Sequence, residues 1–162
     1  MSIQIIRTPH PPEPFLAQIA QLLQAENLAA DEASIHQRAD CLPREDRILM
    51  AVEGDLLLGF AHLRIARELT ADEATEVVSI VVRRTHRRRG IGRMLVTAAE
   101  TWARQSGRAR LLLRTDVVRT AAHAFYIALG YQETATTVDF VRDLGIQGRA
   151  DAPTIPPPDV QR

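Results

Sequence analysis

The sequence of 162 residues predicts one α/β (α+β) domain built on a mixed central sheet. Its first half indicates antiparallel strands, because apolar runs over 47–53 and 56–66 are joined by a short turn that contains glycine. Its second half indicates a parallel pair, because a helical pattern over 91–105 separates the apolar strands 76–82 and 110–115.

The flanking segments complete the predicted order β-α-α-β-β-β-α-β-α-β. They comprise a strand at 3–7, helices at 14–26, 31–41 and about 119–128, and a last strand at about 135–143. Residues 67–75 are polar and predict a loop. The end of the chain is rich in proline and poor in apolar residues, so that it cannot offset the entropy of ordering. We therefore expect a domain over 1–144 and a disordered tail over 145–162.

The composition narrows the class of protein. Lysine and arginine together number 20, all of them arginine, against 20 acidic residues, so no net field favours nucleic acid or an acidic membrane. The single cysteine, Cys41, excludes an internal disulfide, and no apolar run is long enough to span a bilayer. We expect a cytoplasmic protein. Its histidines and Cys41 lack the spacing of metal ligands, so no metal is predicted.

A basic turn rich in glycine joins the predicted strand 76–82 to the predicted helix 91–105. Gly90 and Gly92 allow a tight turn and a close approach of the backbone to a ligand. The N-terminus of the helix offers free N–H groups and a positive dipole, which suit a phosphate or pyrophosphate. The turn is neither a P-loop nor a dinucleotide loop, because Leu95 stands where the latter needs a third glycine.

Two motifs in this chain resemble those of the GNAT superfamily of N-acetyltransferases. Arg87-x-x-Gly90-x-Gly92 resembles the acetyl-CoA signature, which follows an apolar strand in that family. Arg119-x-x-Ala122-His123-x-Phe125-Tyr126-x-x-x-Gly130-Tyr131 resembles a second signature, in which a helix that carries a tyrosine ends at a glycine corner. Many members have asparagine where Arg119 stands, and the Ala-His-x-Phe-Tyr variant is familiar among bacterial members. The resemblance covers about residues 3–144.

The resemblance implies the GNAT topology, in which two parallel strands splay apart and admit the acyl-thioester arm of acetyl-CoA. It implies direct attack of a primary amine on the thioester in a ternary complex, with backbone N–H groups near Ile80 to Val82 stabilising the oxyanion. The residues expected to bind acetyl-CoA are Ile80, Val81, Val82, Arg87, Arg88, Arg89, Gly90, Ile91, Gly92, Arg93, Arg119, His123 and Tyr126.

Two residues are candidates for proton transfer. Tyr126 matches the family tyrosine that protonates the departing thiolate; otherwise it is a core aromatic at the end of a helix. Glu76 is the candidate base, because histone-acetylating members carry their glutamate at the N-terminal end of the central strand. Glu73 and Asp72 are alternatives to it, and a glutamate at a strand end can also be merely exposed.

We expect a small-molecule amine as acceptor, gripped by the segments 26–46 and 67–75. A protein N-terminus or lysine is an alternative acceptor, and a non-catalytic acyl-CoA-binding regulatory module is an alternative function. The arginine run over 83–93 could also be a nucleic-acid footprint, but the phosphates of the cofactor explain it locally, and 4% of aromatic residues leaves little to stack on bases. We expect no nucleic acid or membrane partner, and a monomer or homodimer.

Overall fold

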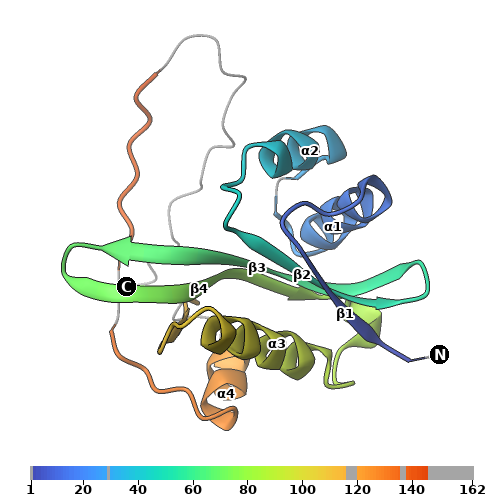
Figure 1. Ribbon diagram of the computed structural model, residues 1–162. Coiled ribbons are helices and arrows are strands. Elements are labelled where there is room, and N and C mark those ends of the chain that lie inside the picture. Colours follow the sequence, from blue (N-terminus) through green and yellow to red (C-terminus); the bar gives the residue numbers. More distant parts are fainter. Residues whose placement is uncertain (1, 29, 116–119, 136–137, 146–162) are drawn as a thin grey trace, which may run out of the picture. The chain divides into compact units, whose positions relative to one another are not determined.

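The computed structural model describes residues 2–28, 30–115, 120–135 and 138–145. The chain divides into two compact units, Met1–Tyr131 and Gln132–Arg162. All helices and strands of the described residues lie in the first unit (Figure 1). In chain order they are β1 (Gln4–Thr8), α1 (Glu13–Ala25), α2 (Glu32–Asp40), β2 (Arg47–Glu53), β3 (Leu56–Glu68), β4 (Ala71–Val82), a 3₁₀ turn (Arg84–His86), α3 (Ile91–Gln105), β5 (Leu111–Leu113) and α4 (Thr120–Ala128). None of these helices is long and apolar enough to cross a membrane.

The strands form one mixed sheet in the order β1-β2-β3-β4-β5. The first three pairings are antiparallel and the pairing of β4 with β5 is parallel, with α3 as the crossover between them. This confirms the predicted fold class, including an antiparallel first half and a parallel pair.

The parallel pair separates partway along β4. Its pairing with β5 ends where Val77 lies opposite Leu113, whereas β4 continues to Val82. Within the described residues, no strand pairs with β4 beyond Val77 on that edge. This open edge is the splay that the resemblance implied.

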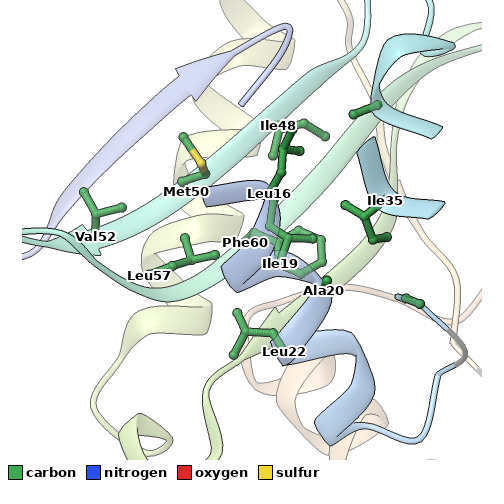
Figure 2. Packing of buried hydrophobic residues seen from close by; sticks show 12 residues of the cluster. Leu16, Ile19, Ala20, Leu22, Ile35, Ile48, Met50, Val52, Leu57 and Phe60 are labelled. Atoms are coloured by element: carbon green, nitrogen blue, oxygen red, sulfur yellow. The ribbon is translucent and has the colours of Figure 1, made fainter. Parts of the chain in front are cut away.

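Helices cover both faces of the sheet (Figure 1). Because side chains alternate along a strand, Ile48, Met50 and Val52 of β2 face α1 and α2, where they pack with Leu16 and other apolar side chains (Figure 2). The intervening Leu49 packs on the opposite face, in the cluster that includes the buried side of α3. We call these the α1/α2 face and the α3 face.

Two sequence expectations for the fold are wrong. Residues 67–75 are mostly strand, because β3 runs to Glu68 and β4 begins at Ala71. Antiparallel pairing carries this hairpin beyond the helices, so its side chains can be polar. The predicted strand at 135–143 is not formed either: residues 135 and 138–143 are not in a strand, and 136–137 lie outside the described residues. An alternating pattern makes a strand only where a neighbouring strand supplies hydrogen bonds. Residues 146–162 of the predicted tail lie outside the described residues.

Candidate active site

The open edge of β4 presents backbone donors. Arg83 N–H donates to Leu58 O at 2.7 Å, and Val81 O also faces β3, where it lies 2.8 Å from the position that a Cβ on Gly59 would take. Since successive residues of a strand point their backbone groups to opposite sides, the N–H groups of Ile80 and Val82 face away from β3, toward the open edge. They are placed to bind a carbonyl oxygen.

The turn from β4 into α3 depends on a left-handed residue. Gly90 caps the helix with a φ of 79°, and a Cβ placed there would meet nothing within 4 Å. No side chain of the described residues caps this end of α3, so capping leaves its first N–H groups unsatisfied. A helix end of this kind suits an anion, and the anion site that the glycine pattern indicates stays a prediction.

Gly92 lies close to α4. A Cβ at this position would lie 3.1 Å from Cζ of Phe125, on α4. The ring of Phe125 thus lies close to the backbone that the sequence analysis assigns to the cosubstrate, and that assignment stays a prediction. This contact brings the first signature, at the start of α3, against the second signature, on α4.

Gly59 joins the open edge to the turn, and the sequence analysis missed it. A Cβ there would meet Val81 O at 2.8 Å, Val82 Cα at 3.2 Å and Ile91 Cγ2 at 3.4 Å. Glycine inside a strand often marks such a close approach. Its absent side chain lets β3 and the start of α3 close around the end of β4.

The arginines of the turn fall into two groups. Arg84 Nε and Arg87 Nη2 lie 3.1 and 2.5 Å from Glu26 Oε1, at the end of α1, and Arg87 Nε donates to Val82 O at 3.2 Å. Burial raises the pKa of Glu26, but the hydrogen bond from Arg84 and the charge of Arg87 outweigh it, so the pKa lies below its usual value. These contacts fix the turn against α1 and against β4.

The second group consists of exposed arginines that make no ion pair with any described residue: Arg88, Arg89 and Arg93. Arg88 adopts a φ of 64°. These side chains surround the free end of α3 and are available to phosphate groups. Arg119, the other predicted cofactor arginine, lies outside the described residues.

Tyr126 lies in an aromatic cluster at the end of α4. It is 9% exposed, and its ring centroid lies 5.3 Å from that of Phe125 and 6.2 Å from that of Tyr131. Tyr131 donates to Glu100 Oε1 at 2.7 Å. Burial raises the pKa of Tyr131 well above its usual value, and Glu100 raises it further. His123 is half-buried on α4. The roles of Tyr126 and His123 stay predictions.

Glu76 lies in the middle of β4, whereas the sequence placed it at the strand's N-terminal end. It faces Arg64 across the β3–β4 pair. Arg64 Nε lies 2.7 Å from its Oε2 and Arg114 Nε lies 3.2 Å from its Oε1, while its own side chain is 3% exposed. The alternative base Glu73 is likewise bound, by Arg67 and Arg108. The predicted base, Glu76, therefore lies in a buried cluster of ion pairs.

A histidine and an aspartate that the sequence analysis did not select form a pair at the side of β3 that faces β2. His62 of β3 has its Nε2 2.7 Å from Asp46 Oδ2, with Asp46 just before β2. The register pairs His62 with Ile48 on one side and with Ser79 on the other. The pairs share the α1/α2 face, because Ile48 packs there. No local sequence pattern predicts this pair of His62 and Asp46, since it depends on the pairing of strands.

No group of three or more His, Cys, Asp or Glu side chains in the described ranges could hold a metal ion. The described part of the site offers the backbone donors of β4 and α3 and the exposed arginines of the turn.

Comparison with known proteins gives a family match. The model of the acetyltransferase (GNAT) family matches residues 15–131. An aminoglycoside N(6′)-acetyltransferase type 1 of Klebsiella aerogenes is 33% identical over 105 residues, which are 62% of this chain and 69% of that protein.

Solved structures share the fold. A transcriptional regulator from Bacillus halodurans C-125 is 18% identical with a TM-score of 0.77, over 87% of this chain and 100% of that one. The aminoglycoside N-acetyltransferase AAC(6′)-Iy in complex with CoA is 17% identical with a TM-score of 0.74, over 87% of this chain and 95% of that one. The same enzyme in complex with the bisubstrate analogue CoA-S-monomethyl-acetylneamine is 18% identical with a TM-score of 0.72, over 88% and 99%.

Proposed function

The chain belongs to the acetyltransferase (GNAT) family, and we propose that it transfers the acetyl group of acetyl-CoA to a primary amine of a small molecule. As a member of this family it is an acyltransferase with acetyl-CoA as cosubstrate. The observation that carries the proposal is the junction of the open edge of β4 with the uncapped start of α3. This junction offers donors for a thioester and for a pyrophosphate on one continuous stretch of chain.

The donors fit the two ends of the cosubstrate. Pyrophosphate is bound by the first N–H groups of α3, with Arg88 and Arg93 adding charge. The acyl-thioester arm then follows the open edge of β4, in the place of a neighbouring strand, and accepts hydrogen bonds from the N–H groups of Ile80 and Val82. A carbonyl oxygen that accepts from such donors is stabilised further as it becomes an oxyanion.

The reaction is direct attack. The acceptor amine must be neutral, because an ammonium has no lone pair and its reference pKa is about 10.4 for a lysine-like amine. Attack forms the C–N bond, and loss of the thiolate breaks the C–S bond. Tyr126 is our candidate for the acid that protonates the thiolate, by its match to the family tyrosine. The group that deprotonates the amine is argued below.

The proposed acceptor is a small amine of the aminoglycoside class. Support comes from the relative in Klebsiella aerogenes and from AAC(6′)-Iy, whose complex contains an acetylated neamine. A protein amine is the alternative acceptor. Monomer or homodimer remains our expectation for the assembly.

Titration calorimetry with acetyl-CoA tests the cosubstrate site. We expect binding in the micromolar range, lost in Gly90→Val and kept in Gly107→Val. Gly107, just past the other end of α3, has a φ of 74° and, like Gly90, nothing within 4 Å of a Cβ, so both substitutions impose the same backbone strain. Equal binding by both variants would contradict the proposed position of the phosphates.

Release of CoA then tests the acceptor. Neamine and a lysine-containing peptide are supplied separately with acetyl-CoA. Faster turnover with neamine supports the small-molecule proposal, and faster turnover with the peptide would replace it with the protein alternative. Binding of acetyl-CoA without turnover on any amine of a broad panel would favour an acyl-CoA-binding module.

A further inference from the structure

We propose that His62, oriented by Asp46, is the general base that takes the proton from the acceptor amine. The inference rests on the proposed acetyl transfer and concerns the acceptor side of the same site. It assigns a role to two residues from different elements, one in β3 and one just before β2.

The first argument is position. A register shift between His62 and Leu63 leaves Val78 as an extra residue in β4, so that this bulge resets the alternation of the strand. As a result, Ser79 shares the α1/α2 face with Glu76 and lies opposite His62. Directly opposed residues have Cβ atoms about 5 Å apart. His62 is thus one cross-strand step from Ser79, and the next residue is Ile80, whose N–H faces the open edge.

The second argument is the state of the imidazole. The carboxylate of Asp46 can only accept, so the hydrogen between the two groups is carried by His62 Nε2, and the lone pair of the neutral ring is on Nδ1. Within the described residues, no hydrogen bond occupies Nδ1, and this atom is not completely buried. Nδ1 therefore has some contact with solvent, in a side chain that is 19% exposed as a whole.

The third argument is that Asp46, which orients His62, is itself held in place. Asp46 has a side chain that is 6% exposed, and its N–H donates to Pro43 O at 3.0 Å. A buried carboxylate of this kind holds an imidazole in one tautomer and stabilises the imidazolium that forms when the ring takes a proton. The pair thus holds Nδ1 in one fixed orientation.

Glu76 is less accessible to an acceptor than His62. Both of its oxygens are bound by guanidinium groups, from Arg64 and Arg114, and its side chain is 3% exposed. A base has to reach the proton that it removes, within hydrogen-bond distance or through one water. We assign Glu76 a positioning role, in which it holds Arg64 on the same face as His62.

The charged groups around His62 on this face are Asp46, Arg64 and Glu76, with Arg114 on the far side of Glu76. The helices α1 and α2, which cover this face, contribute apolar side chains to the core that contains Ile48. Half of the side chain of Arg64 is exposed, so this part of the face is open to an acceptor.

The proton balance is as follows. His62 Nδ1 takes one proton from the acceptor ammonium, and the neutral amine nitrogen attacks the thioester carbon. The C–S bond breaks with its electron pair on sulfur, and the nitrogen's remaining extra proton replaces the one that the acid gives to the thiolate. Products are the N-acetyl compound, CoA thiol and protonated His62, which returns its proton to solvent.

The test uses neamine as acceptor and compares His62→Gln and Asp46→Asn with His10→Gln. His10 forms a similar pair with Asp40, with Nε2 2.9 Å from Oδ1, at an exposed place between β1 and α1. We expect His62→Gln to lower kcat at least 100-fold with the KM for acetyl-CoA unchanged, Asp46→Asn to lower it about tenfold, and His10→Gln to change it less than twofold. Calorimetry with acetyl-CoA shows that each variant is folded and binds the cosubstrate.

The pH profile separates a base from a structural residue. We expect the acid limb of kcat/KM to be lost in His62→Gln, and partly restored in His62→Gly by added imidazole. A His62→Gln variant with near-normal kcat and an intact acid limb would overturn the role of His62 and leave acetyl transfer standing. A wild-type protein without turnover on any amine would reject the proposed function and the role of His62 with it.

Discussion

The turn after β4 and the polar part of the α1/α2 face differ in whether their charged side chains are paired. In the turn, Arg88, Arg89 and Arg93 make no ion pair with any described residue, and the start of α3 is uncapped. On the face, the carboxylates of Asp46 and Glu76 are nearly buried and bound by His62, Arg64 and Arg114. The first region leaves its charge unpaired within the described residues, whereas the charges of the second region hold side chains in place.

The difference suggests a division of labour at β4. In our proposal, its open edge and the turn bind the cosubstrate, which supplies the compensating negative charge. In the same proposal, its α1/α2 face orients groups for proton transfer, which need fixed geometry more than net charge. Substitutions in the two regions should therefore have different consequences: loss of affinity in the first, loss of stability or of kcat in the second.

The largest effect is expected where the two regions meet. Gly59→Val would place a Cβ 2.8 Å from Val81 O and against the start of α3. Backbone atoms must move to accommodate it, so we expect a loss of about 3 kcal/mol in the free energy of unfolding and a weaker affinity for acetyl-CoA. Urea denaturation and calorimetry measure the two quantities.

Ala66→Val is the control for this substitution. It enlarges a half-buried residue of the same strand, opposite Ala74 and away from the open edge. We expect its affinity for acetyl-CoA to equal that of the wild type. If Gly59→Val binds acetyl-CoA as tightly as Ala66→Val, the proposed path of the acyl arm along β4 is wrong.

Next in size is Glu76→Gln. The neutral amide loses the charge that pairs with Arg64 and Arg114, at a site where the side chain is 3% exposed. Both arginines are about half-exposed and can regain water, so we expect a cost of about 2 kcal/mol in the free energy of unfolding, below the range for a fully buried pair. Binding of acetyl-CoA should be unaffected.

Glu32→Gln removes the same charge from an exposed position on α2, where it lies 3.8 Å from His36 Nε2. Its expected change in the free energy of unfolding is within about 0.5 kcal/mol. Equal denaturation midpoints for the two variants would show that the ion cluster does not stabilise β4.

Paired loss of exposed arginines has a smaller effect, and on affinity alone. For Arg88→Ala with Arg89→Ala we expect acetyl-CoA to bind about tenfold more weakly, a change of about 1.4 kcal/mol, with a reduced dependence on salt and an unchanged free energy of unfolding. Arg38→Ala with Arg44→Ala removes the same charge elsewhere and should leave the affinity as it is. An equal loss in both pairs would indicate a general charge effect.

How much of this the sequence predicts depends on the distance between the residues involved. The geometry of the turn could be predicted, because Arg87, Gly90 and the start of α3 lie within a few residues and the local chain determines how they are arranged. Gly59 carried a usable signal, a glycine inside an apolar strand, although its partners could not be named.

The dyad of Asp46 and His62 could not be predicted. Its geometry is set by the register of β2 against β3, and its relation to β4 depends on a bulge at Val78. The surroundings of Glu76 were misjudged for a related reason: polar residues before it were taken for a loop, but cross-strand pairing extends the strand through them. Long-range pairing, and not local pattern, decides which charges on this face are buried together.

The smallest effect tests the contact that joins the turn to the α1/α2 side. Glu26→Gln would release Arg84 and Arg87, which now lie 3.1 and 2.5 Å from one carboxylate oxygen. Both arginines are largely exposed, so the cost to folding should be below about 1 kcal/mol. Because the pKa of Glu26 is lowered in the folded protein, its contribution is present above the unfolded pKa and is lost as the pH falls through the folded one. We therefore expect the wild type and Glu26→Gln to converge in stability under acid conditions, below the pKa of about 4.3 of an unfolded glutamate, and to differ at neutral pH. Urea denaturation across this range measures the difference in stability. The same difference at every pH would mean that packing at the end of α1, and not the charge of Glu26, holds the turn.

The affinity of Glu26→Gln for acetyl-CoA gives a second test. The released arginines are free to reach phosphate, so an unchanged or slightly tighter affinity would fit the assignment of this turn to the cosubstrate. Complete loss of binding would instead assign Arg87 to the fold of the turn.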